Sequence, residues 1–332
     1  MSDPRPPYRN ILVIKPGAVG DLLQMTPVFR ALKRYGPSSR TTLIVGSGST
    51  ASLFRNDPTI DAVIVYDRAN ASLLSLWKGL RKERFDLVLN FQRSNLRTWV
   101  LASAAFPCRL LVYRRARSRT VHAVENYLET LAPLGIPATD MALKLSLDEE
   151  NRSFAGDLIR SRGLAGSPVI ALNPGATHAV NRWPAPLFAA LADRIQRELG
   201  ARALVVGGPD DVALAEEIIA RSETKPLSLA GKTTLLQLGA VLERCAVLVS
   251  GDTGPMHMAA AVGTPVIALF GAADPARTGP VGTGHRIIRA KDVSCVPCRS
   301  RTCSNRIPLE CMEKIGVDEV LAAVEADVRE RR

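Results

Sequence analysis

The sequence predicts an α/β protein made of two doubly wound domains in tandem. Short apolar, β-branched runs alternate with longer amphipathic stretches, which is typical of βαβ units that build a parallel sheet. The chain has 332 residues, more than one hydrophobic core usually organises. A stretch rich in Pro and Gly (132–144), followed by the acidic cluster Asp148–Glu150, separates two series of predicted strands. We therefore expect domains at 1–150 and 151–332, with a cleft between them.

The predicted strands fall into these two series. The first series comprises Ile11–Ile14, Thr42–Val45, Ala62–Tyr66, Leu87–Phe91 and Leu110–Tyr113. The second series comprises Val169–Leu172, Ala203–Val206, Val247–Ser250, Val266–Phe270 and Arg286–Ile288. Helical periodicity appears between the strands, for example over Leu22–Tyr35 and Ser72–Arg84.

The composition is that of a soluble globular protein, with 46% hydrophobic and 23% charged residues. No apolar run approaches the roughly 18 residues that a membrane helix requires. The first ten residues are polar and proline-rich, and we expect no signal peptide. The protein is therefore expected to stay in the cytoplasm, where disulfides are rare.

Positive charge is concentrated in the first half of the chain. Residues 1–150 hold 21 Lys and Arg against 13 Asp and Glu, a net charge of +8, out of +11 for the whole chain. Such an excess indicates an anionic partner, although arginines on a solvated face would produce the same count. The basic segment 109–119 lacks the interleaved aromatic residues of a single-strand nucleic-acid platform. It favours an acidic, phosphorylated acceptor or an anionic membrane surface, with Arg114, Arg115 and Arg117 as candidate contacts.

The segment 250–257, Ser-Gly-Asp-Thr-Gly-Pro-Met-His, is the most informative stretch of the chain. It lies between an apolar run (246–249) and a small-residue run (258–262), which predicts a strand, a tight turn and a helix. Ligands of open α/β sheets bind at the carboxyl ends of strands, and a helix N-terminus suits a diphosphate. Asp252 and His257 flank that position, so we expect a nucleotide or nucleotide-sugar site here.

Two further loops follow predicted strands of the second domain. Residues 173–177 are followed by Asn181-Arg182-Trp183-Pro184, and Thr177 and Arg182 are placed to reach phosphate oxygens. The loop 207–211 follows the next strand and contains Asp210. Three loops at one edge of one sheet predict a pocket.

In the first domain, the opening strand leads into Lys15-Pro16-Gly17-Ala18-Val19-Gly20-Asp21 and then a helix. Gly17 and Gly20 allow backbone to approach a ligand closely, but this is not the dinucleotide-binding fingerprint. Asp21 stands at the helix start. It is either an N-cap residue, worth about 1 kcal/mol of helix stability, or a general base that takes a proton from an attacking hydroxyl.

Four of the six cysteines lie within 17 residues, in the pattern Cys295-x2-Cys298-x4-Cys303-x7-Cys311. Four thiolates are able to close a tetrahedral site for zinc or iron, although the spacing is not that of a standard zinc ribbon. The alternatives are a structural metal site in the loop 295–311 and free thiols.

The chain resembles glycosyltransferase family 9, which contains the ADP-heptose:lipopolysaccharide heptosyltransferases. The resemblance covers most of the chain. It rests on Ile11-Leu12-Val13-Ile14-Lys15 through Gly20-Asp21-Leu22 with Thr26-Pro27, and on 251–257 continuing through Gly263-Thr264-Pro265 to Leu269-Phe270-Gly271. Arg182-Trp183-Pro184 and the cysteine cluster are also similar to features of many members. It implies a GT-B fold, with two Rossmann-like domains facing across a cleft, the acceptor on the N-terminal and the nucleotide sugar on the C-terminal domain.

By position, the resemblance implies that Asp21 is the catalytic base. It implies that the contacts to diphosphate and sugar come from Asp252, Thr253, Gly254 and His257, with Thr177 from the neighbouring loop. One position departs from the family. Where well-known heptosyltransferases have a lysine two residues before the Trp-Pro pair, this chain has Asn181. Either Arg182 supplies the positive charge instead, or the donor differs.

The function expected is that of an inverting transferase, which moves a heptose or related sugar from an ADP-sugar to a hydroxyl of the lipopolysaccharide inner core or a related glycan. No cofactor is expected for catalysis, because helix N–H groups near Gly254 and a cationic side chain balance the leaving diphosphate. The acceptor would be an anionic glycolipid, met through transient association with the cytoplasmic face of the inner membrane. Alternatives are another nucleotide-sugar donor, a sugar-nucleotide epimerase, and a non-catalytic binder of nucleotide sugars.

Overall fold

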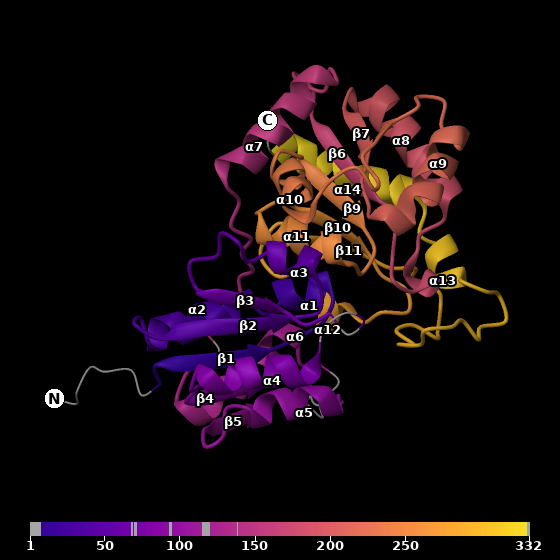
Figure 1. Cartoon of the computed structure of the whole chain (residues 1–332). Helices are drawn as coiled ribbons and strands as arrows, with labels where there is room; N and C mark the ends of the chain where they lie inside the picture. The colour runs from indigo at the N-terminus through magenta and orange to yellow at the C-terminus, as the bar shows by residue number, and fades with distance from the viewer. Residues whose placement is uncertain are drawn as a thin grey trace. The chain divides into compact units, whose positions relative to one another are not determined.

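The computed structural model describes residues 8–67, 69, 72–92, 95–114, 120–137 and 139–330. The chain divides into two compact units, Met1–Ser146 and Leu147–Arg332. Each unit contains one parallel sheet flanked by helices (Figure 1). Among the described residues, no helix is both long and apolar enough to cross a bilayer.

The sheet of the first unit has the order β3-β2-β1-β4-β5. Its strands are β1 (Asn10–Ile14), β2 (Arg40–Val45), β3 (Ala62–Val65), β4 (Leu87–Asn90) and β5 (Arg109–Val112). Its helices are α1 (Val19–Leu23), α2 (Thr26–Tyr35), α3 (Gly48–Ser52), α4 (Leu73–Lys82), α5 (Leu96–Ser103) and α6 (Ala123–Leu128), followed by the 3-10 helix η1 (Glu129–Leu134).

The sheet of the second unit has the order β11-β10-β9-β6-β7-β8. Its strands are β6 (Val169–Asn173), β7 (Arg202–Val205), β8 (Leu227–Ser228), β9 (Val247–Ser250), β10 (Val266–Leu269) and β11 (Arg286–Ile288). Its helices are α7 (Glu149–Ser161), α8 (Ala185–Leu199), α9 (Val212–Arg221), α10 (Leu235–Glu243), α11 (Gly254–Ala261), α12 (Pro275–Thr278), α13 (Glu310–Glu313) and α14 (Val317–Glu330). Two 3-10 helices, η2 (Ala179–Asn181) and η3 (Pro209–Asp211), lie in its loops.

The strand order reverses once in each sheet. In the first unit β1 pairs with β2 on one side and β4 on the other, and in the second unit β6 pairs with β7 and β9. Ligands of doubly wound sheets bind where the order reverses, at the carboxyl ends of these strands. Helix α1, which carries Asp21, follows β1, and the loops 174–178 and 251–253 follow β6 and β9. The topology therefore places the predicted site residues at the ligand-binding edges.

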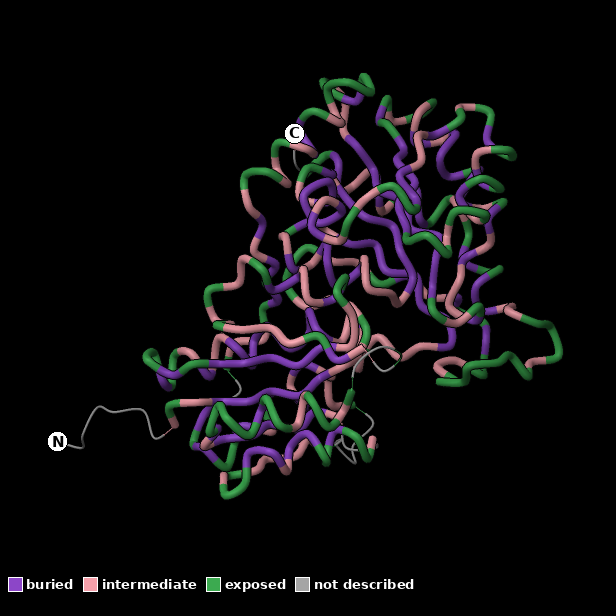
Figure 2. Tube along the Cα trace, viewed as in Figure 1, coloured by how far each residue is buried: buried purple, intermediate pink, exposed green. Residues whose placement is uncertain are grey.

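The central strands of both sheets are buried on their two faces, whereas the edge strands β3, β5 and β11 are partly exposed (Figure 2). The strands read as continuous apolar runs rather than alternating ones, because helices cover both faces. In β1, Leu12, Val13 and Ile14 are completely buried, as are Leu248 and Val249 in β9.

All ten predicted strands are present, with ends within two residues of those predicted. Two details differ from the prediction. The helix expected over Leu22–Tyr35 is divided into α1 and α2, with Gln24 and Met25 between them. Pro27, which has no N–H to donate, lies in the first turn of α2, where a helix tolerates it. The two-residue strand β8 was not predicted, because so short an edge strand leaves no apolar run to detect.

A buried carboxylate ties α8 to the segment after α9. Asp193 accepts hydrogen bonds from Ser222 Oγ at 2.5 Å, Thr224 N at 2.8 Å and Glu223 N at 3.0 Å. Burial raises the pKa of Asp193, but these hydrogen bonds outweigh that effect and the pKa lies at about 2, below its ordinary value of 3.8.

We expect Asp193→Asn to destabilise the second unit by about 2 kcal/mol at pH 7, since the charged form receives these hydrogen bonds. The folded-state pKa is depressed, so this stability is fully present above pH 4 and is lost as the pH falls towards 2. Urea unfolding at pH 7 and at pH 3 checks the prediction. The matched control is Asp157→Asn, which removes an exposed pair with Arg160 and should change stability little. An equal loss in both variants would contradict it.

Candidate active site

Asp21 lies in the first turn of α1, at the ligand-binding edge of the first unit. The N-cap of α1 is Ala18, and no side chain caps this helix end, so the N-cap interpretation of Asp21 is wrong. The carboxylate instead forms an ion pair with Lys15, with 2.9 Å between Nζ and Oδ2. Its side chain is 45% exposed, which leaves it accessible to a substrate.

Lys15 and Tyr127 hold this carboxylate from the protein side. Lys15 is buried, and its Nζ lies 3.3 Å from Tyr127 Oη and 5.3 Å from the centre of the Tyr127 ring. The Tyr127 hydroxyl donates to Asp21 Oδ1 at 3.3 Å. Burial, and then the negative charge of Asp21, raise the pKa of Tyr127 well above its ordinary value, so the phenol stays a hydrogen-bond donor at neutral pH. Two donors thus orient one carboxylate.

The glycines of this loop keep its backbone close to the pair. A Cβ at Gly17 would lie 3.0 Å from Lys15 Cε and 3.1 Å from Asp21 Oδ2, so a side chain there would crowd the ion pair. Gly20 is the second residue of α1 and is partly buried. From the sequence, neither Lys15 nor Tyr127 was predicted to act at this site.

In the second unit, one amide joins two strand-end loops. The buried Asn173 at the end of β6 places Nδ2 3.0 Å from Ser250 Oγ, 3.1 Å from Thr253 Oγ1 and 3.2 Å from the carbonyl oxygen of Gly175. Ser250 and Thr253 share a further hydrogen bond of 3.0 Å. The loops after β6 and β9 are therefore held together by Thr253, which was predicted as a donor contact, and by Asn173 and Ser250, for which the sequence predicted no role.

Helix α11 begins at Gly254, with Thr253 as its N-cap residue in extended conformation. The Thr253 side chain does not cap the helix, because it bonds to the neighbouring loop. Pro255 in the first turn has no N–H. The first N–H groups of α11 are thus without a side-chain cap, and with the helix dipole they suit an anion such as a diphosphate.

Asp252 and His257 lie on either side of this helix start. His257 is buried, and its Nε2 is 3.9 Å from Asp252 Oδ1. The other carboxylate oxygen of Asp252 accepts a hydrogen bond from Thr278 Oγ1 at 2.9 Å. The structure therefore brings both predicted residues to one place.

The loop after β6 carries Thr177, which is exposed, and Arg182. Arg182 donates from Nε and from its terminal nitrogen to the carbonyl oxygen of Ala176, at 3.2 and 2.9 Å. Its guanidinium is therefore held beside Thr177. Trp183 packs against Phe188 and donates to the carbonyl oxygen of Ile315, so it anchors this loop in the core.

Asn181, the position that departs from the family, is packed against the loop after β9. A Cβ at Gly251 would lie 2.5 Å from the carbonyl oxygen of Asn181. The side-chain Oδ1 of Asn181 is buried, and within the described part of the chain it has no hydrogen-bond partner. A buried acceptor of this kind calls for an explanation, and contact with a bound ligand is one that the position at the strand-end loops allows.

In the third loop, Asp210 and Asp211 differ in their contacts. Asp210 is exposed, whereas Asp211 accepts from Gly208 N at 2.8 Å. The Asp211 carboxylate occupies the space beside Gly175, where a Cβ would lie 2.1 Å from Oδ1. The loops after β6, β7 and β9 are thus packed against one another at one edge of the sheet.

The basic segment of the first unit is only partly described. Arg114 is exposed just after β5, and its carbonyl oxygen accepts from Asn126 Nδ2 at 2.9 Å. Arg115 and Arg117 lie outside the described residues.

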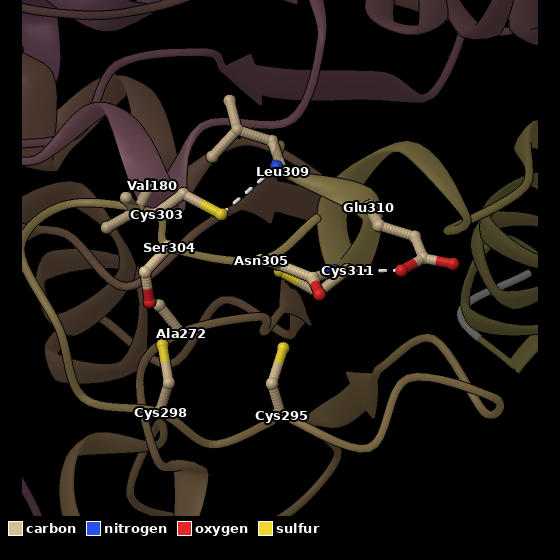
Figure 3. A pocket seen from close by; sticks show the side chains of 10 residues that line it. All are labelled: Val180, Ala272, Cys295, Cys298, Cys303, Ser304, Asn305, Leu309, Glu310 and Cys311. Carbon is tan, nitrogen blue, oxygen red and sulfur yellow. Dashed lines mark hydrogen bonds between the residues drawn. The ribbon is translucent and has the colours of Figure 1, made fainter. Parts of the chain in front are cut away.

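The four clustered cysteines line one cavity of about 170 Å³ in the second unit (Figure 3). All four are free thiols; Cys295, Cys298 and Cys303 are exposed and Cys311 is buried. Burial, and then the neighbouring cysteines, raise the pKa of Cys311. Cys303 Sγ accepts from Leu309 N at 3.3 Å. Among the described residues, no three His, Cys, Asp or Glu side chains are arranged to hold a metal ion, so the four thiols do not form a coordination site in this arrangement.

Two doubly wound units, one presenting a carboxylate and the other a helix N-terminus within three polar loops, are typical of glycosyltransferases of the GT-B fold. The model of glycosyltransferase family 9 (heptosyltransferase) matches residues 73–307, and the chain belongs to this family. The predicted fold class and enzyme class are confirmed, and the alternative of a non-catalytic binder loses its support.

Curated relatives match over most of their length. The chain is 28% identical to lipopolysaccharide heptosyltransferase 3 of Escherichia coli (strain K12) over 334 residues, covering 92% of this chain and 94% of the relative. It is 27% identical to the lipopolysaccharide core heptosyltransferase OpsX of Haemophilus influenzae over 299 residues, covering 84% of each.

Solved structures agree with the fold. The family 9 glycosyl transferase from Veillonella parvula DSM 2008 superposes with a TM-score of 0.85 and 28% identity, covering 97% of this chain and 98% of that one. The E. coli heptosyltransferase WaaC with ADP has a TM-score of 0.71 and 17% identity, covering 96% and 99%.

Proposed function

We propose that this protein transfers a heptose from ADP-heptose to a hydroxyl of the lipopolysaccharide inner core or a related surface glycan, with inversion at the anomeric carbon. The observation that carries the proposal is the Asp21 carboxylate, half-exposed and held by Lys15 and Tyr127 at the ligand-binding edge. Membership in family 9 and the similarity to two lipopolysaccharide heptosyltransferases support the choice of sugar.

In this proposal the acceptor hydroxyl attacks the anomeric carbon while Asp21 takes its proton, and the bond to ADP breaks. The ion pair with Lys15 and the hydrogen bond from Tyr127 aim the carboxylate. Both groups act from the protein side, so the exposed part of the carboxylate remains available to the hydroxyl.

The leaving diphosphate would be held by the second unit. The N–H groups at Gly254, the Thr253 loop and the cationic Arg182 beside Thr177 supply donors and positive charge. Asp252 and His257 are assigned to the sugar, and Asp210 to the nucleoside. No cofactor takes part in these steps.

The acceptor is proposed to be an anionic glycolipid, met by the first unit through Arg114, Arg115 and Arg117 at the cytoplasmic face of the inner membrane. The charge of +8 over residues 1–150 supports this assignment.

The test is release of ADP from ADP-heptose, with and without a Kdo-containing lipid A acceptor, with Asp21→Ala as the control. We expect release that requires the acceptor and is lost in the variant. Release from another nucleotide sugar but not from ADP-heptose would overturn the donor assignment and direct attention to Asn181. No turnover with any donor and acceptor would contradict the transferase assignment.

We also propose that Cys295, Cys298, Cys303 and Cys311 bind a structural zinc or iron ion. Four thiols on one cavity are the donor set that these metals prefer, and side-chain rotations would be needed to bring them into coordination. Elemental analysis of protein purified without a metal-binding tag should find about one metal ion per chain. A metal content near zero, with all four thiols titrating with a thiol reagent in the folded protein, would contradict the site.

A further inference from the structure

Large apolar side chains are exposed along two neighbouring helices of the first unit. Leu74 on α4 is 62% exposed and Leu96 on α5 is 77% exposed. Trp99, Val100 and Phe106 are also among the exposed large hydrophobic residues. Scattered single residues of this kind need no explanation, but a group gathered on one surface marks an interaction site.

The two helices form one continuous surface. They lie side by side in the first unit (Figure 1), and Trp77 Nε1 on α4 donates to Ser103 Oγ on α5 at 3.1 Å. Arg81 on α4 donates to the carbonyl oxygens of Ala104 and Phe106, beyond the end of α5. These hydrogen bonds therefore join α4 to the C-terminal end of α5 and the residues that follow it.

Helical periodicity puts the exposed residues on shared faces. Leu96, Trp99 and Val100 follow the i, i+3, i+4 spacing of one face of α5. On α4, Leu74 shares a face with Lys78 and Lys82, at i+4 and i+8. We call the exposed surface of Leu74, Lys78, Lys82, Leu96, Arg97, Trp99, Val100 and Phe106 the α4–α5 face.

The charge on this surface has one sign. Residues 72–110 contain seven Lys and Arg but only two Asp and Glu. The two acidic groups have partners outside the segment: Glu83 pairs with Arg40 at 3.3 Å, and Asp86 accepts from Arg9 N and Asn10 N. Lys78, Lys82 and Arg97 are exposed. The α4–α5 face therefore combines apolar side chains with a net positive charge.

We propose that the α4–α5 face docks on an anionic bilayer surface, with its apolar side chains in the head-group layer and its cations against lipid phosphates. Surfaces of mixed apolar and basic character bind in this way, because burial of apolar groups and attraction to anionic lipid add together. A symmetric dimer through the same face would bring like charges together, which disfavours a second copy as the occupant. The proposal deepens the proposed function, on which it rests for the lipid-linked acceptor.

The experiment is flotation of the full chain with vesicles, in the absence of substrates. Vesicles of phosphatidylglycerol and phosphatidylethanolamine are compared with vesicles of phosphatidylcholine alone. We expect binding to the anionic vesicles that weakens as salt is raised. Lys78→Gln with Lys82→Gln should weaken partitioning about fivefold for each cation removed.

The double variant Leu96→Ser with Trp99→Ser should weaken partitioning onto anionic vesicles about tenfold or more, since two apolar side chains no longer enter the head-group layer. The matched control is Tyr35→Ser, which removes an exposed aromatic residue of α2 in the same unit and should bind like the wild type. Thermal unfolding verifies that all variants fold.

Equal binding by the wild type and both double variants would overturn the proposal, as would absence of binding to anionic vesicles. A concentration-dependent dimer in light scattering that Leu96→Ser with Trp99→Ser abolishes, without vesicle binding, would assign the face to a second copy instead. ADP release with a delipidated acceptor is measured separately on the wild-type protein. Vesicle binding without any ADP release would contradict the proposed function but would leave the docking surface supported.

Discussion

Asp21→Asn is expected to lower kcat for sugar transfer by about 10²–10⁴-fold, the usual contribution of a positioned general base. Asparagine keeps the shape of the side chain but cannot take the proton of the acceptor hydroxyl. KM for the donor should change little, because the diphosphate contacts are assigned to other residues. Steady-state kinetics with ADP release as the readout check this, and thermal unfolding shows whether the fold is retained.

Tyr127→Phe provides the matched comparison for that variant. It keeps the ring under Lys15 but removes the hydroxyl that donates to Asp21 at 3.3 Å. We expect a smaller loss of kcat, about tenfold, because one of two orienting donors remains. Turnover by Asp21→Asn within a factor of a few of the wild type, in a folded protein, would remove Asp21 from the role of base.

Gly251→Ala is expected to lower kcat/KM for the donor by at least about tenfold and to destabilise the second unit by about 1–3 kcal/mol. The added Cβ would lie 2.5 Å from the carbonyl oxygen of Asn181, so the loops after β6 and β9 must move apart. Donor titration by calorimetry and urea unfolding measure the two effects.

Gly316→Ala is the control, because nothing lies within 4 Å of a Cβ at that position. Its donor affinity should match that of the wild type. If Gly251→Ala binds donor normally, the packing of these two loops does not shape the donor site.

The strands could be predicted from the sequence because parallel strands buried on both faces are continuous apolar runs. The positions of Asp21 and of the segment 250–257 followed from the same pattern, since each lies in the strand-to-helix connection that such a run begins. Once strand ends are located, the topology assigns the loops to a ligand-binding edge without any knowledge of side-chain contacts.

The partners of the site residues could not be predicted in this way. Tyr127 lies 106 residues from Asp21 in the sequence, on the six-residue helix α6, and no local pattern connects them. Asp210 and Asp211 are adjacent and chemically identical, and only the turn geometry of η3 directs Asp211 towards Gly175. For the cysteines, spacing placed four thiols on one cavity but did not determine the directions of their Sγ atoms.

The amide of Asn173 has a consequence for how donor preference changes in evolution. Because it bonds to Ser250, Thr253 and Gly175 at once, we expect the two loops to behave as one rigid part. Substitutions at any of these positions disturb the whole part and would lower activity towards every donor alike. New specificity is therefore expected to arise at residues outside this set, such as Thr177 and Asn181, whose side chains vary without releasing the shared bonds. A library randomised at those two positions should yield altered donors, whereas one randomised at Asn173 should yield mostly inactive protein.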